Sequence, residues 1–107
     1  MADVQQVTTA NFEEFTATKS VVVLDFSAEW CGPCKILTPI IHELAAEYGD
    51  EVAFGAVDVD QNRELAEKFS IMSVPSVFFF KDGQVANNLI GLQQKDKLRG
   101  IIDNLKG

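Results

Sequence analysis

The chain has 107 residues, 47% of them hydrophobic, and a formal net charge of −7 at pH 7. Its length suits one domain, and the acidic charge with scattered Lys and Arg excludes a phosphate-binding stripe for nucleic acid. The start of the chain has no signal-like segment, and apolar runs such as residues 74–80 are too short to span a bilayer. We therefore expect one domain over residues 1–107 without nucleic-acid or membrane partners. We expect it in the cytoplasm or, if a transit peptide was removed, in the mitochondrial matrix or another reducing compartment.

The chain begins with two short elements and a strongly apolar strand. Residues 4–7 indicate a short strand and residues 11–15 a short helix. Residues 21–27, VVVLDFS, are nearly continuous in branched and aromatic side chains, which is typical of a strand buried on both faces. We therefore expect this strand at the centre of a sheet.

A long amphipathic helix is predicted to follow the central strand. From Pro33 to Tyr48 the apolar side chains recur at spacings of three and four residues, and Gly49 can end the helix. Pro33 suits the first turn, where its missing N–H costs no hydrogen bond. Pro39 lies inside the helix and removes a hydrogen bond to the carbonyl of Lys35, so we expect a kink there.

Strand and helix patterns alternate in the second half of the chain. Residues 52–59, VAFGAVDV, and residues 76–80, SVFFF, indicate two further strands. Asp60 is predicted to cap a helix over residues 61–69 between them. Because helical segments connect the three strands in turn, we expect these strands to pair in parallel.

The C-terminal part is predicted to form a hairpin and a helix. Asp82-Gly83 is the favoured two-residue hairpin turn, so residues 84–90 should return antiparallel to the strand before them. The last helix is marked by apolar residues at helical spacing: Leu98, Ile101, Ile102 and Leu105. These elements predict an α/β fold, in which helices cover both faces of a mixed sheet.

Two cysteines lie where the central strand gives way to the long helix. Cys31 and Cys34 fall at the carboxyl end of the strand and in the first turn of the helix, where open α/β sheets tend to place their chemistry. A metal site needs about four ligands, whereas the chain offers two cysteines and one histidine. A crosslink across so short a loop constrains the unfolded chain little. Reversible redox chemistry is therefore favoured over a metal site or an inert pair.

The two thiols are expected to differ in their chemistry. Unpaired N–H groups and the positive end of the helix dipole stabilise a thiolate, which is the form that attacks disulfides. Cys31 lies nearest these donors and follows Trp30, so we expect it to be the exposed nucleophile. Cys34, one turn further, is expected to be more buried and to act as the resolving thiol.

Further landmarks accompany the motif WCGPC of residues 30–34: DF at 25–26, Pro39 in the helix, VP at 74–75, KDG at 81–83 and IGL at 90–92. Together they resemble the thioredoxin family over essentially the whole chain. The resemblance implies a thioredoxin fold, a three-layer sandwich in which about four helices flank a mixed sheet of about five strands. It also implies a monomeric protein-disulfide reductase without bound cofactor or metal. In such a reductase Cys31 forms a mixed disulfide with a substrate protein, and Cys34 releases the reduced product.

The resemblance also implies a partner that supplies electrons and a set of tuning residues. A flavin- and NADPH-dependent thioredoxin reductase would restore the dithiol. Gly32 and Pro33 are the pair typical of the reducing members of this superfamily, whereas oxidases and isomerases usually carry a histidine between the cysteines. The chain is therefore expected to donate electrons to disulfide-containing proteins.

Asp25 is a carboxyl group in an apolar strand. Burial there would raise its pKa and make it a plausible proton acceptor near neutral pH, although a strand residue that reaches water is the plain alternative. The resemblance implies that Asp25 lies beneath Cys34 and deprotonates it.

A substrate-docking surface is also implied by the resemblance. The Val74-Pro75 bond would be cis and would expose main-chain groups to an extended substrate segment. The remaining apolar or small residues of the surface would be Trp30, Gly32, Met72, Ile90 and Gly91.

Two positions depart from the family pattern. Ser27 stands where many thioredoxins have a second tryptophan, which leaves less bulk under the active-site loop. Ala56 stands where they commonly have a lysine beside the buried aspartate. Without that ammonium group, the pKa of Asp25 is expected to be higher.

A non-catalytic role is the alternative hypothesis. Thioredoxin folds also serve as binding subunits or holdases, in which the apolar surface binds a partner and the thiols are incidental. The presence of both cysteines favours the reductase.

Overall fold

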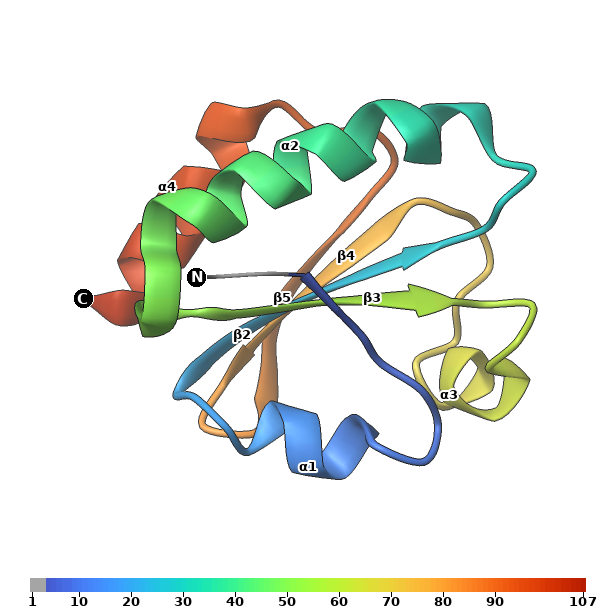
Figure 1. Cartoon of the computed structure of the whole chain (residues 1–107), viewed down its shortest axis with the longest axis horizontal. Coiled ribbons are helices and arrows are strands. Elements are labelled where there is room, and N and C mark those ends of the chain that lie inside the picture. Colours follow the sequence, from blue (N-terminus) through green and yellow to red (C-terminus); the bar gives the residue numbers. More distant parts are fainter. Residues whose placement is uncertain (1–3) are drawn as a thin grey trace.

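The computed structural model describes residues 4–107, and its helices lie on both faces of a mixed sheet (Figure 1). The strands are β1 Val4–Gln6, β2 Val21–Ser27, β3 Ala53–Asp58, β4 Ser76–Lys81 and β5 Gln84–Ile90. The helices are α1 Phe12–Thr16, α2 Gly32–Tyr48, α3 Arg63–Lys68 and α4 Lys95–Lys106, with a short 3-10 helix at Gly49–Glu51. Across this described part of the chain, the five strands are ordered β1, β3, β2, β4, β5. The predicted three-layer sandwich is confirmed.

Strand β2 lies at the centre of the sheet and supplies both halves of the core. Val21 and Val23 pack beneath α2 and α4, whose buried residues include Leu37, Ile41, Leu44, Leu98 and Ile102. Val22, Leu24 and Phe26 point the other way and pack with side chains such as Phe12, Phe15 and Leu65. Figure 1 shows α2 and α4 over one face of the sheet and α1 and α3 over the other. The continuous apolar run in β2 is therefore explained by burial on both faces.

The predicted direction is right for β3 and wrong for β4. Strand β3 is parallel to β2, but β4 is antiparallel to it, with Asp25 opposite Val77. The helix α3 spans only about 9 Å, against about 20 Å for a six-residue strand, and the connection through it does not carry the chain back along the sheet. The chain therefore enters β4 at the same edge of the sheet at which it left β3.

The predicted cap of α3 is also wrong. The helix begins at Arg63, and Asn62 rather than Asp60 occupies its N-cap position. The Asp58 carboxylate accepts hydrogen bonds from the backbone N–H groups of Asp60 and Gln61, at 2.9 and 3.3 Å. These bonds hold residues 58–61 in a turn before the helix starts, which leaves the Asp60 side chain available for another contact.

The predicted end of the long helix and the predicted hairpin are confirmed. Gly49 ends α2 with a φ of 59°, in the left-handed region that favours glycine. Asp82 and Gly83, with φ values of 50° and 82°, form the turn between β4 and β5, which pair antiparallel. Pro39 lies inside α2 as expected. The kink at Pro39 stays a prediction.

Candidate active site

The two cysteines form a disulfide at the N-terminus of α2. Cys31 is the N-cap residue and Cys34 lies in the first turn, with their Cα atoms 5.3 Å apart. That separation lies within the usual range for disulfides, about 4.4–6.8 Å. The backbone N–H of Cys34 donates to the Cys31 sulfur at 3.2 Å. A helix N-terminal donor therefore points at the sulfur of Cys31.

The expected difference in exposure between the cysteines is absent. Cys31 is 4% exposed and Cys34 is 2% exposed, so both are buried in the disulfide form. Ala28, Val59 and Val74 pack around the pair. The prediction of an exposed Cys31 is wrong for this form, because the loop carrying Val74 covers its sulfur.

That loop brings a second segment against the disulfide. The Cys31 sulfur lies 3.7 Å from the carbonyl oxygen of Val74, and the Val74-Pro75 peptide bond is cis, the isomer that the resemblance implied. The backbone N–H of Gly91 donates to the carbonyl of Pro75 at 2.8 Å. These contacts therefore connect the residues around Cys31, Val74 and Gly91 at one end of strands β2, β4 and β5.

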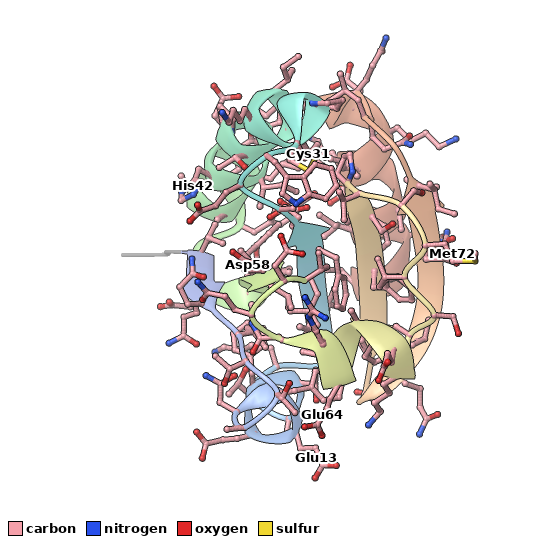
Figure 2. The ribbon with its side chains drawn as sticks, turned by 90° about the vertical axis from the view of Figure 1, so that its right-hand side faces the viewer. Glu13, Cys31, His42, Asp58, Glu64 and Met72 are labelled. Atoms are coloured by element: carbon pink, nitrogen blue, oxygen red, sulfur yellow. A yellow bond between two sulfur atoms is a disulfide. The ribbon has the colours of Figure 1, made fainter. Side chains whose placement is uncertain are left out.

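Large apolar side chains are exposed around this edge. Trp30 is 71% exposed and Ile90 is 65% exposed. Met72 is 95% exposed, and Figure 2 shows its side chain directed away from Cys31 into solvent. Gly32 and Pro33 are exposed in the first turn of α2, whereas Pro75 is buried. The structure thus brings Val74, Pro75 and Gly91 together and leaves Met72 apart from the disulfide.

Trp30 makes a hydrogen bond that the sequence did not lead us to expect. Its indole N–H donates to the Asp60 carboxylate at 2.8 Å. Asp60 follows the end of β3, next to the end of β2 from which the cysteine loop departs. Since adjacent parallel strands end at the same edge of a sheet, this position is the signal that could have revealed the contact.

Asp25 is buried in β2 on the face covered by α2. It is 2% exposed, and its Oδ1 atom accepts no hydrogen bond from the part of the chain that the structure describes. Burial raises the pKa of Asp25 to about 7. The predicted rise in this pKa is therefore supported, with desolvation of the carboxylate as its cause.

A cavity of about 550 Å³ connects Asp25 with Cys34. Its walls come from β1, β2, β3 and the first half of α2. The small residues Ser27 and Ala56 line it, at the two positions where the sequence departs from the family pattern. The sequence indicated less bulk near the active-site loop, but it did not reveal a cavity that reaches the buried carboxyl.

The described part of the chain offers neither a metal-binding cluster nor a membrane-spanning helix. Residues 4–107 contain no group of three or more His, Cys, Asp or Glu side chains that could hold a metal ion. Within the same residues, no helix has the length and apolarity needed to cross a lipid bilayer.

The chain is similar to thioredoxins in sequence and in structure. The thioredoxin family model matches residues 3–104. The thioredoxin of Staphylococcus haemolyticus is 40% identical over 98 residues, which cover 92% of this chain and 93% of that protein. A mutant thioredoxin from Halobacterium salinarum superimposes with a TM-score of 0.91 at 34% identity, covering 98% of this chain and 92% of that one. The Malassezia sympodialis thioredoxin gives a TM-score of 0.88 at 34% identity, covering 100% and 94%.

These similarities extend over nearly the whole chain and include the fold. The paired cysteines are close enough to form a disulfide, so they can exchange two electrons with a substrate disulfide. The chain therefore belongs to the thioredoxin family and is a thiol–disulfide oxidoreductase that reduces protein disulfides.

Proposed function

We propose that Cys31 is the attacking thiol, Cys34 the resolving thiol and Asp25 the proton acceptor of this protein-disulfide reductase. The observation that carries the proposal is the Cys31 sulfur at the N-terminus of α2, which accepts the Cys34 N–H at 3.2 Å. This donor and the positive end of the helix dipole favour the Cys31 thiolate. Cys34 lies behind it and lines the same cavity as Asp25.

The reaction has two exchange steps. The Cys31 thiolate attacks one sulfur of the substrate disulfide, whose S–S bond breaks as a bond from Cys31 to the substrate forms. The departing substrate thiolate takes a proton from water. The Cys34 thiolate then attacks the sulfur of Cys31 and releases the second substrate sulfur. Two electrons pass to the substrate, and the Cys31–Cys34 disulfide remains.

Asp25 accepts the proton of Cys34 in the second step. Burial raises its pKa to about 7, so a large fraction is ionised at neutral pH while the basicity is higher than that of an ordinary carboxylate. An aspartate at its usual pKa of 3.8 would be a weaker base toward a thiol. The burial of Asp25 therefore suits this role.

Substrates bind at the exposed apolar edge beside the disulfide. An extended segment of the substrate pairs with the main chain at Val74-Pro75, and Gly32 and Pro33 set the geometry of the first turn and tune the redox potential. The remaining residues of this docking surface are Trp30, Met72, Ile90 and Gly91. The exposure of Trp30 and Ile90, and the link from Gly91 to Pro75, support this assignment.

The same proposal includes the electron donor, the oligomeric state and the compartment of the protein. A flavin- and NADPH-dependent thioredoxin reductase restores the dithiol, and the chain itself carries no cofactor. We also propose a single-domain monomer, because one chain supplies both thiols and the docking surface. A compartment that keeps thiols reduced, the cytoplasm or the mitochondrial matrix, suits this reaction.

Insulin reduction and substrate trapping test the proposal. With dithiothreitol, the protein should accelerate precipitation of the released insulin chain, and Cys34→Ser should hold substrates on Cys31 as mixed disulfides. The matched variant Cys31→Ser should trap far less. Equal trapping by both variants would reverse the assignment of the thiols, and no insulin reduction would favour the non-catalytic binding role.

A further inference from the structure

The side chains that β2 directs toward α2 change from apolar to polar halfway along the strand. Val21 and Val23 belong to the apolar core on this face, but the next two residues on it are Asp25 and Ser27. On the neighbouring strand, Ala56 lies opposite Asp25. A carboxyl and two small side chains therefore occupy a place where the sheet elsewhere presents large apolar groups.

The cavity of about 550 Å³ lies at this change. Its volume falls in the range of small-molecule sites, about 300–1,000 Å³. Asp25 lines it, is 2% exposed, and has an Oδ1 atom without a hydrogen-bond partner among residues 4–107. A buried acceptor without a partner is unusual, because its loss of hydration is not compensated. Asp25 thus contributes a buried carboxyl group to the wall of the cavity, with which a donor on a bound ion would pair.

The charged groups around the cavity favour a cation. Glu29, from the loop after β2, and Asp58, from the end of β3, line it together with Asp25. Lys35 and His42 line it from α2. Three carboxyl groups therefore oppose one lysine and one histidine, so the electrostatic balance is negative once Asp25 is ionised.

The other lining groups select the kind of cation. Val4, Ile41 and Ala56 add apolar surface to the walls, which would contact an alkyl group. An ammonium head donates up to three hydrogen bonds, and bonds from a cation to a carboxylate are among the stronger ones. The described residues form no cluster of three ligands for a metal ion. The site therefore suits an ammonium head with a short alkyl tail.

We propose that this cavity is a binding site for a small primary alkylammonium ion, which pairs with the Asp25 carboxylate from the side of the sheet covered by α2. The ion lies beside Cys34 and near the two small residues Ser27 and Ala56. The site is separate from the docking surface, which is built by loops at the edge of the sheet. Figure 2 shows His42, on the cavity side, and Met72, on the docking side, on opposite sides of Cys31.

Binding of the ion must change the titration of Asp25. A ligand that prefers the ionised carboxylate lowers its pKa, and a preference of about tenfold corresponds to about one pH unit at saturation. Glu29, Lys35, His42 and Asp58 are the other charged or titratable groups that face the cavity, so their titrations are followed in the same experiment. The protein is kept in its disulfide form, in which Cys34 does not titrate.

The experiment is a pH titration of the Asp25 side-chain carboxyl by carbon-detected NMR, with increasing ethylammonium chloride. We expect the pKa of Asp25 to fall and then level off, by about one unit. Sodium chloride at the same ionic strength and ethanol, a neutral molecule of similar size, are the controls. A linear response, or an equal response to sodium chloride, would overturn the proposal, because it would indicate screening instead of a site.

Two variants at one position test the location. Ala56→Leu fills the space beside Asp25 and should abolish the response to ethylammonium. Ala56→Lys places a tethered ammonium group there, so the pKa of Asp25 should already be lower and the added ion should have little further effect. A wild-type response in Ala56→Leu would place the ion elsewhere and overturn the proposal. If Ala56→Leu does not fold, Ser27→Leu serves the same purpose from β2.

The outcome does not depend on the proposed thiol chemistry, because the titration uses the disulfide form and measures no turnover. Saturable binding without any effect on insulin reduction would support the site and count against the role proposed for Asp25. Absence of binding in a protein that reduces insulin would overturn the site alone.

Discussion

Replacing Asp25 with asparagine should remove a large pH dependence from the stability of the fold. Asp25 is 2% exposed, and burial raises its pKa from 3.8 to about 7. Because the folded pKa lies above the unfolded value, the folded state binds more protons than the unfolded state between these two pH values. The contribution of Asp25 to the free energy of unfolding should therefore be highest below pH 3.8, decrease as the pH rises, and level off above about pH 7.

The magnitude follows from the size of the pKa change. Each pKa unit corresponds to about 1.4 kcal/mol, so the change at Asp25 amounts to about 4 kcal/mol over the full window. Between pH 4.5 and pH 8, about 3 kcal/mol of this should be observed. Asparagine has nearly the same shape and does not titrate, so the variant should gain stability relative to the wild type by this amount as the pH rises.

Urea unfolding of both proteins in the disulfide form measures the effect. The quantity of interest is the difference in free energy of unfolding between wild type and Asp25→Asn at each pH, in which the titration of other groups cancels. The free-energy cost of burying the asparagine amide does not depend on pH, so it shifts this difference by the same amount at every pH. A difference that does not change between pH 4.5 and pH 8 would refute the reasoning, since Asp25 would then have an ordinary pKa in the folded protein.

Two further substitutions test contacts at opposite ends of α2. Tyr48, its last residue, donates a hydrogen bond from its hydroxyl to Asp103 at 2.6 Å. Tyr48→Phe should therefore lower the free energy of unfolding by about 1–3 kcal/mol in urea, with insulin reduction unchanged, because the cysteines lie more than three turns away. Asp60→Asn weakens the 2.8 Å bond from Trp30, the one tryptophan in the sequence. Tryptophan fluorescence should change, and kcat/KM for insulin should fall by less than tenfold while alkylation of Cys31 keeps its rate, since the bond is exposed and worth about 1 kcal/mol. A loss of alkylation rate would instead connect Asp60 with the thiol.

Local signals predicted most of the fold. The run VVVLDF of residues 21–26 predicted a strand buried on both faces, and Asp82-Gly83 predicted the hairpin, because in both cases adjacent residues determine the outcome. The direction of β4 was not predictable in the same way. It depends on whether the connection between β3 and β4 carries the chain back along the sheet, and a helical pattern between two strands does not determine this. The short helices α1 and α3 both connect strands, yet β1 and β2 run parallel whereas β3 and β4 run in opposite directions.

The candidate site was predictable where chemistry and spacing coincide. Cys31 and Cys34 were placed correctly at the start of α2, because a strand followed by a helix with an early proline fixes where the motif must lie. The burial of Cys31 was not predicted, since it depends on the loop at Val74, 43 residues further along the chain. The bond from Trp30 to Asp60 joins residues 30 apart and depends on the order of the strands.

The burial of Asp25 connects the stability of this protein with its chemistry. A valine at this position would continue the row of Val21 and Val23 under α2 and would carry no charge to desolvate. The carboxyl instead costs the folded state about 4 kcal/mol above neutral pH, by the same change in pKa that makes it a better base for the proton of Cys34. A cation beside Asp25 would reduce the cost by favouring the ionised form, and it would lower the basicity in equal measure. Because Ala56 supplies no such charge, an ion bound in the cavity would adjust stability and proton transfer together, with opposite effects on the two.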